Sequence, residues 1–114
     1  MKIIDASFEG RDPMMLVNCI QGAKSIKELF GKDWQTIRKW IIVDTEVENR
    51  NPVLYIVTDI GNYFTTASGL IKKLQDYDLK CKAAKRDLPR AKFYSKKSEK
   101  TGNTFFAIYF EEQL

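Results

Sequence analysis

Two segments of this chain, residues 34–40 and 90–96, alternate aromatic and basic residues at the spacing of a β-strand. Alternate residues of a strand point to the same side of a sheet, so each segment would gather rings and cations on one face. Cations track the phosphates of a nucleic-acid strand, and flat rings stack on bases whose pairing edges are free. The two segments therefore predict a surface for an unpaired nucleic-acid strand.

The predicted contacts form two chemical groups. The rings expected to stack on bases are Trp34, Trp40, Tyr63 and Tyr94. The cations expected to contact phosphates are Arg38, Lys39, Arg90, Lys92, Lys96, Lys97 and Lys100. Core burial is the competing interpretation for Trp40, which precedes an apolar run at 41–43, and one bulge in the strand would exchange its two faces.

The positive charge is concentrated in one part of the chain. The 114 residues hold 19 Lys or Arg and 15 Asp or Glu, a formal net charge of +4. Residues 71–100 alone hold eleven Lys or Arg and four acids, a net charge of +7, which leaves −3 for the remainder. This polarity favours an anionic partner such as nucleic acid. A solvated, lysine-rich surface is the alternative interpretation.

The composition argues against catalysis. The chain has no histidine, which excludes imidazole-dependent triads and removes the commonest ligand of zinc. Cys19 and Cys81 cannot form a metal site alone and are expected as buried, reduced thiols. Asp44, Glu46 and Glu48 alternate and could hold Mg²⁺, but such a row at a strand end is more often a solvent face. We therefore expect a binding module with no catalytic residue, cofactor or metal.

The pattern of apolar residues predicts strands at 14–20, 34–48, 53–58, 90–97 and 104–110. Residues 63–66 are expected to pair back onto 53–58 as the second strand of a hairpin. In residues 68–80 the apolar residues recur at the spacing of one face of a helix, with Thr66 or Ser68 as the N-cap. The helix is expected to extend toward residue 86. In the last strand, Phe105 and Tyr109 share one face. A helix between strands three and four of a five-stranded sheet is the order of an OB-fold barrel. The predicted fold is therefore mainly β with one helix, as an OB-fold-like barrel.

The whole chain, residues 1–114, is expected to form a single domain, with residues 1–12 and 111–114 as loose termini. The first residues lack the apolar core of a secretory signal, and no run approaches the roughly 20 apolar residues of a membrane span. A cytoplasmic protein without a membrane partner is the expectation.

Several short stretches carry a resemblance to a known group. They are LVNCIQG and SIKEL at 16–29, VLYIVTD and GNYFTTAS at 53–68, and KF with GNTFF at 92–106. Together they resemble the small OB-fold single-stranded DNA-binding proteins of phages and mobile elements, particularly of protein-primed phages. The resemblance implies a non-catalytic protein that coats single strands during replication or recombination in a bacterial host. The acidic C-terminal tail of bacterial single-strand binders is reduced here to Glu111 and Glu112.

The leading hypothesis is thus a sequence-independent single-stranded DNA-binding protein. The first alternative is a protein-interaction module whose aromatic residues dock on a replication or conjugation partner. A second is a nuclease that uses the acidic row of residues 44–48. RNA is a further ligand class, because stacking serves both polymers. Assembly into a homo-oligomer and contact with a replication or recombination protein are compatible with the leading hypothesis.

Overall fold

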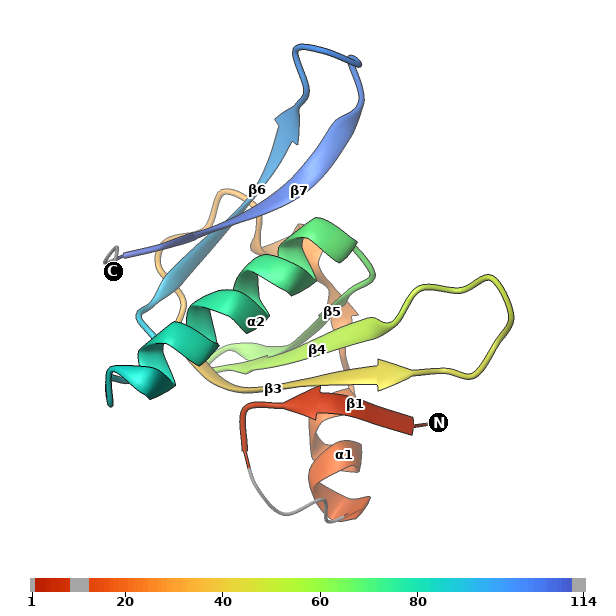
Figure 1. Ribbon diagram of the computed structural model, residues 1–114, viewed down its shortest axis with the longest axis vertical. Coiled ribbons are helices and arrows are strands. Elements are labelled where there is room, and N and C mark those ends of the chain that lie inside the picture. Colours follow the sequence, from red (N-terminus) through yellow and green to blue (C-terminus); the bar gives the residue numbers. More distant parts are fainter. Residues whose placement is uncertain (1, 9–12, 112–114) are drawn as a thin grey trace.

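The computed structural model describes residues 2–8 and 13–111 (Figure 1). In chain order its elements are β1 (Lys2–Ala6), α1 (Pro13–Ile20), β2 (Lys24–Ser25), the 3₁₀ helix η1 (Ile26–Leu29), β3 (Ile37–Asp44), β4 (Val53–Thr58), β5 (Gly61–Thr65), α2 (Ser68–Ala83), β6 (Ala91–Lys97) and β7 (Thr104–Phe110). None of the described helices is long and apolar enough to cross a membrane.

The strands form two sheets, and the predicted five-stranded OB-fold barrel is wrong. One sheet has the order β1-β3-β4-β5-β2, and the hairpin β6–β7 forms the other. Between residues 30–35 and β6 there are only two isolated bridges, Phe30 to Phe93 and Gln35 to Ala91, so no closed barrel exists among the described residues. The larger sheet does not close into a barrel because β1 and β2 pair with the two edges of the meander β3–β4–β5. The order of elements in the sequence does not reveal such long-range pairing.

Helix α1 replaces the strand predicted at residues 14–20. Leu16 and Cys19, three residues apart, pack toward the sheet, whereas Met14 and Val17 are exposed. A short apolar run fits a strand and a helix equally well, and Pro13 at the first helical position favours the helix. Residues 2–6, predicted to be loose, form β1 and pair with β3, whereas 1, 9–12 and 112–114 lie outside the described residues.

Strand β3 is shorter than the predicted 34–48 and is buried on both sides. Trp40 and Ile42 pack in the main core, while Ile41 and Val43 pack with Cys19 of α1 in a second cluster. The pairing of β3 with β4 shifts register between residues 37 and 39, which brings Ile37 to the same side as Trp40. This bulge reverses the alternation that the sequence predicts at the start of the strand. Val47, predicted to lie in the core, is 50% exposed.

The remaining predicted elements are confirmed. The hairpin β4–β5, the helix α2 and the hairpin β6–β7 occur close to the expected positions. Leu70, Ile71 and Leu74 are buried on α2, as the helical period predicts. Neither Thr66 nor Ser68 caps the helix, because the N-cap position is Ala67, whose N–H donates to Thr65 Oγ1 at 3.1 Å.

Both cysteines are buried and unpaired, as expected. Burial is the main cause that raises the pKa of each thiol, so both favour the neutral form. These thiols therefore serve as small apolar side chains of the interior, Cys19 against β3 and Cys81 on α2.

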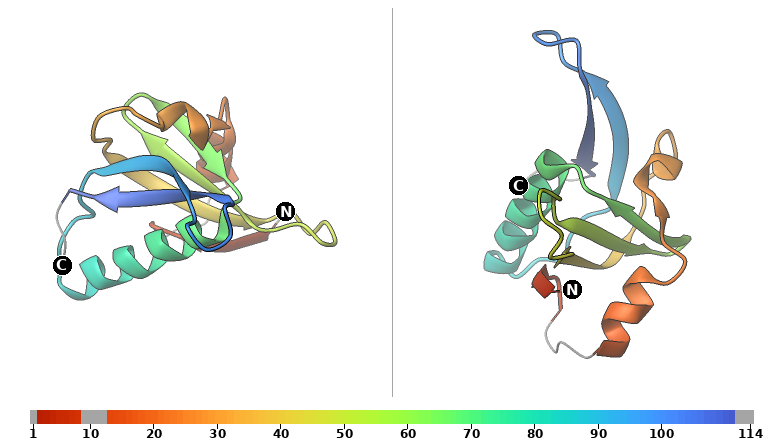
Figure 2. Two further views of the ribbon diagram at one scale, coloured as in Figure 1. Left: turned by 90° about the horizontal axis from the view of Figure 1, so that it is seen from above. Right: turned by 90° about the vertical axis from the view of Figure 1, so that its right-hand side faces the viewer.

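The hairpin β6–β7 projects from one end of the molecule, and α1 lies at the opposite end (Figures 1 and 2). Helix α2 runs beside the base of the hairpin, where Tyr77 stacks on Phe110 with ring centroids 4.0 Å apart. Phe93 and Ile108 of the hairpin join Leu74 and Trp40 in the main core. The hairpin is thus fixed at its base, and its far half extends beyond the core.

Two leucines of α2 test this description of the core. Leu74 is fully buried, whereas Leu79 is 70% exposed. We expect Leu74→Ala to lower the free energy of unfolding by about 2–5 kcal/mol, because it removes buried methyl groups and leaves a cavity. The matched control Leu79→Ala should change it by less than about 0.5 kcal/mol. Urea denaturation followed by circular dichroism measures both, and equal losses would contradict the assigned packing.

Candidate nucleic-acid interface

The hairpin β6–β7 has one buried face and one outer face. Phe93 pairs with Ile108 and both are buried, so the residues that alternate with them point the other way. The resulting outer face, called here the hairpin face, consists of Lys92, Tyr94 and Lys96 of β6 with Phe105, Ala107 and Tyr109 of β7. The sequence prediction that Lys92, Tyr94 and Lys96 share one face, opposite Phe93, is confirmed.

Rings and cations on the hairpin face are in direct contact. Tyr94 and Tyr109 meet edge to face, with centroids 5.3 Å apart and an interplanar angle of 71°. The ammonium of Lys96 lies 4.3 Å from the centre of the Tyr109 ring, and that of Lys73, from α2, lies 4.9 Å from it. Each such contact at an exposed site contributes about 0.5–1 kcal/mol. Two positive charges are therefore held beside one ring.

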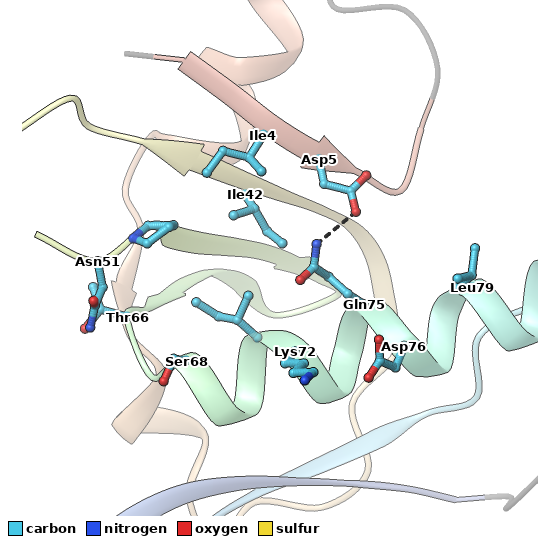
Figure 3. Close-up of a pocket in the computed structure, with 12 residues that line it drawn as sticks. Ile4, Asp5, Ile42, Asn51, Thr66, Ser68, Lys72, Gln75, Asp76 and Leu79 are labelled. Carbon is cyan, nitrogen blue, oxygen red and sulfur yellow. Dashed lines mark hydrogen bonds between the residues drawn. The ribbon is translucent and has the colours of Figure 1, made fainter.

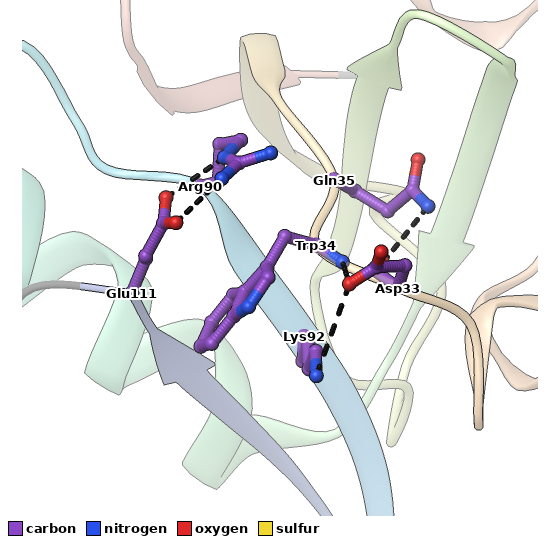
Figure 4. A network of polar contacts seen from close by, with 6 residues as sticks. All are labelled: Asp33, Trp34, Gln35, Arg90, Lys92 and Glu111. Atoms are coloured by element: carbon purple, nitrogen blue, oxygen red, sulfur yellow. Dashed lines mark hydrogen bonds and ion pairs between the residues drawn. The ribbon is translucent and has the colours of Figure 1, made fainter.

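Trp34 extends the hairpin face although it lies far from β6 in the sequence. The backbone of Gln35 exchanges two hydrogen bonds with Ala91, at 2.8 and 2.9 Å, which places Trp34 beside β6. The Lys92 ammonium lies 4.7 Å from the centre of the indole ring and 3.9 Å from a carboxylate oxygen of Asp33 (Figure 4). Trp34 remains half-buried, so part of its surface is open to solvent.

Arg90, at the start of β6, is held by a carboxylate. Its guanidinium donates two hydrogen bonds to Glu111, one from Nε at 2.8 Å and one from Nη2 (Figure 4). Hydrogen bonding to Arg90 lowers the pKa of Glu111, and the same contact raises the pKa of Arg90. A phosphate would have to displace Glu111 before it could bind Arg90 in the same way.

Two predicted stacking residues are buried, which is a correction to the sequence prediction. Trp40 is 2% exposed and Tyr63 is 6% exposed, and both belong to the main core. Trp40 is buried because β3 is covered on both sides, and Tyr63 pairs with Ile56 in the centre of the sheet. Neither ring offers a face to a base.

Apart from Arg90, the predicted cations lie in three places. Lys92 and Lys96 belong to the hairpin face, while Lys97 and Lys100 are exposed toward the hairpin tip. Arg38 and Lys39 lie instead on β3, where they line a pocket with Lys82 of α2 and Arg86 of the segment that follows α2. The Arg38 Nε donates to Asp59 at 2.6 Å, which raises the pKa of Arg38, and Lys39 Nζ lies 3.8 Å from Met15 Sδ.

Three contributors were not among the predicted contacts: Tyr109, Phe105 and Lys73. The alternation of Phe105 and Tyr109 in the last strand was visible in the sequence, but the strand pairing that joins them to Lys96 was not. Lys73 depends on how α2 packs beside β7. Phe105, Tyr109 and Lys73 line a groove of about 270 Å³ between α2 and β7, so the candidate interface includes a concave part.

A second groove, of about 520 Å³, has different chemistry. It lies between β1, β3 and α2, where Ile4, Ile42 and Leu79 contribute apolar surface (Figure 3). Gln75 Nε2 donates to Asp5 Oδ2 at 3.0 Å across it. Among the described residues that line it, Lys72 is the only basic one, and the lining also includes two acids, Asp5 and Asp76. This groove is therefore a poor match for a polyanion.

The acidic row of residues 44–48 gains no support as a metal centre. Among the described residues, no group of three or more acids or cysteines is placed so that it could hold a metal ion. Comparison of the chain with protein-family models, curated proteins and solved structures finds no match. The hairpin face is therefore the feature of the molecule from which a function can be inferred.

The Arg90–Glu111 pair gives a prediction about pH. In the folded protein the pKa of Glu111 is lowered, so the pair contributes stability above the ordinary glutamate pKa, and this is lost as pH falls through the lowered value. We expect Arg90→Gln to return the pKa of Glu111 toward its ordinary value, measured by carboxyl NMR during an acid titration. Arg38→Gln, which breaks the Arg38–Asp59 pair, is the control and should leave the pKa of Glu111 unchanged. An unchanged Glu111 pKa in Arg90→Gln would contradict the pair.

Proposed function

We propose that this protein binds single-stranded DNA through the hairpin face, without sequence preference and without catalysing a reaction. The observation that carries the proposal is the direct contact between rings and lysines on this face. Trp34, Tyr94 and Tyr109 are half-buried and Phe105 is 47% exposed, so each of these four aromatic side chains is partly accessible to solvent. A merely solvated, lysine-rich surface does not account for the exposed rings. Packing in the core does not account for them either, because core rings are buried.

Stacking accounts for the expected lack of sequence preference. Each base that stacks on an aromatic side chain contributes about 1–3 kcal/mol, and every base has a π-face. In a duplex those faces are already stacked within the helix and unavailable to the protein. The rings therefore favour an unpaired strand over a double helix, while lysine–phosphate contacts are shared by both ligands.

The lysines that lie on the rings have a second role when DNA binds. A base that stacks on Tyr109 competes with the ammonium groups of Lys73 and Lys96 for the ring. The displaced ammonium then has the adjoining phosphate as a partner. Lys97 and Lys100, nearer the hairpin tip, would extend this phosphate contact along the strand.

The biological setting that we propose is the coating of single strands in replication or recombination of a phage or mobile element, in the cytoplasm of its host. This setting rests on the resemblance of the short sequence stretches described above, and it requires the binding activity to exist.

Salt-dependent binding to an oligo-dT strand tests the proposal, with Trp34 quenching as the signal. Tyr109→Ala should weaken binding by about tenfold, the loss expected for about 1.4 kcal/mol of stacking. Lys96→Gln should reduce the slope of log K against log salt by about 0.7, the value for one phosphate on a single strand. Phe64→Ala and Lys24→Gln change an exposed ring and an exposed lysine on β5 and β2, and serve as matched controls.

The ligands used for comparison are duplex DNA and oligo-rA. Clear preference for oligo-dT over duplex supports the proposal, and equal binding of oligo-rA would extend it to RNA. Equal affinity for single and double strands, or no binding at low salt, would overturn it. Salt-insensitive binding of a protein partner with no response to oligonucleotides would favour the interaction-module hypothesis instead.

A further inference from the structure

Strand β7 has an outer edge that is free of any other strand in the described part of the chain. Its partner is β6, and the far half of the hairpin projects away from the larger sheet (Figures 1 and 2). Sheet edges commonly resist pairing through a charged side chain or a proline, as on β1, where Asp5 accepts the backbone N–H of Ala6 at 2.9 Å. The sequence of β7 contains neither. This edge, called here the β7 edge, is therefore open to an added strand.

Hydrogen bonds next to the strands show which backbone groups face the β7 edge. The Glu111 N–H donates to the Arg90 carbonyl at 2.8 Å, so these two residues are a hydrogen-bonded pair. Such pairs alternate with non-bonded pairs along an antiparallel ladder, so every second residue of β7 directs its backbone groups outward. Ala91, which faces outward on β6 in the same way, pairs there with Gln35. On β7 the outward residues are Thr104, Phe106, Ile108 and Phe110.

The open part of the β7 edge is its projecting half. Ile108 is fully buried, whereas Thr104 is exposed and Phe106 is half-buried. Among the described residues, no backbone group is hydrogen-bonded to the outward N–H and C=O of Thr104 or Phe106. Each residue of a hydrogen-bonded pair exchanges two bonds with its partner. These positions can therefore hold two residues of an added strand through its backbone alone.

A groove follows the β7 edge and determines the chemistry of the chain that fits it. Two adjoining pockets, of about 360 and 270 Å³, lie between β7 and the first turns of α2, and Gly69 and Phe106 line both. Among the described residues that line them, Lys73 and Lys96 are charged and none is acidic. Both ammonium groups lie over the ring of Tyr109, which carries no net charge to balance them. The groove therefore favours carboxylates.

We infer that the β7 edge binds an extended acidic segment of a partner protein as an additional strand. The alternate side chains of such a strand point to opposite faces of the sheet. Carboxylates on the side of the hairpin face meet Lys73 and Lys96, and apolar side chains on the other side pack beside Phe106. Backbone hydrogen bonds supply the affinity, and the lysines select the acidic sequence.

A second copy of this chain is a poorer occupant of the β7 edge. An antiparallel copy of β7 would direct its hairpin tip, which carries the exposed Lys97 and Lys100, toward Lys73 of the first copy. Like charges in such proximity repel each other. An acidic segment instead balances the positive charge of the groove, so charge complementarity favours a partner protein.

The groove shares Lys73, Phe105 and Tyr109 with the surface proposed to bind DNA. An acidic segment at the β7 edge therefore competes with an unpaired nucleic-acid strand for these residues. This competition rests on the function proposed above, whereas the pairing with β7 does not, because it uses backbone groups that face away from β6.

A fluorescent octapeptide that alternates glutamate and valine tests the inference. We expect saturable binding at low salt, followed by anisotropy, and a slower hydrogen exchange of the Thr104 and Phe106 amides in the complex. The gain in protection should be larger at these two amides than at Phe105 and Ala107, whose backbone groups already face β6. An octapeptide with lysine in place of glutamate is the control for charge.

Two substitutions test the edge and the groove separately. Thr104→Pro removes an outward N–H that β6 does not use, and should weaken peptide binding by about fivefold, the loss of one hydrogen bond. Thr104→Val keeps that N–H and is the matched control. Gly69→Leu narrows the groove from α2, where an added Cβ meets no atom of the protein within 4 Å. We expect it to weaken peptide binding by about tenfold while the circular dichroism spectrum stays unchanged.

No saturable binding, equal binding of the lysine octapeptide, or equal affinity of Thr104→Pro and Thr104→Val would overturn the inference. Protection of the same two amides that rises with protein concentration, without peptide, would assign the edge to a second copy and would also overturn it. Displacement of the octapeptide by oligo-dT supports the competition. Peptide binding without any binding of oligo-dT would overturn the proposed function and leave the β7 edge site intact, and the reverse result would overturn the edge site alone.

Discussion

The alternation of the β6–β7 hairpin is the constraint on which the candidate interface depends. Phe93 and Ile108 are a directly paired couple in the main core, and both are fully buried. Because neighbouring residues of a strand point to opposite sides, Lys92, Tyr94 and Tyr109 must then lie on the outer face. A shift of the strand pairing by one residue would put lysines into the core. The free-energy cost of burying their charges is far greater than the free energy of any surface contact. Core packing thus fixes the face that is offered to a ligand.

The two tryptophans show how the same fold assigns opposite roles to one residue type. Trp40 lies on β3, a strand buried on both sides, and its ring fills the main core. Trp34 precedes β3, where the chain leaves that sheet and pairs through Gln35 with Ala91 at the start of β6. Because of this bridge, Trp34 lies outside the core and contacts Lys92. The bridge therefore connects the segment before β3 to the hairpin face.

Local periodicity made part of this structure predictable. The helix at residues 68–83 and the hairpin at 91–110 follow patterns that repeat over many residues, and the outer position of Lys92, Tyr94 and Lys96 follows from the same alternation. The sequence prediction was wrong where tertiary contacts decide. Examples are the helix at 13–20, whose apolar run is too short to show a period, and the bulge near residue 38, which brings Ile37 to the same side as Trp40. The barrel was wrong because strand pairing across the chain, including the edge strand at 2–6, leaves no local signal.

Basic residues serve more than one surface of the protein. Lys73, Lys92 and Lys96 lie on rings beside the hairpin, while Lys39, Lys82 and Arg86 line a pocket between β3 and the C-terminal end of α2. In the proposed function, an unpaired strand binds to the hairpin face. Amide NMR of ¹⁵N-labelled protein, titrated with an oligo-dT strand, locates the residues that a bound strand contacts. We expect the largest chemical-shift changes at Trp34 and along β6 and β7, with α1 at the far end unaffected. Changes centred on α1 and β1, or none at a low salt concentration, would contradict it.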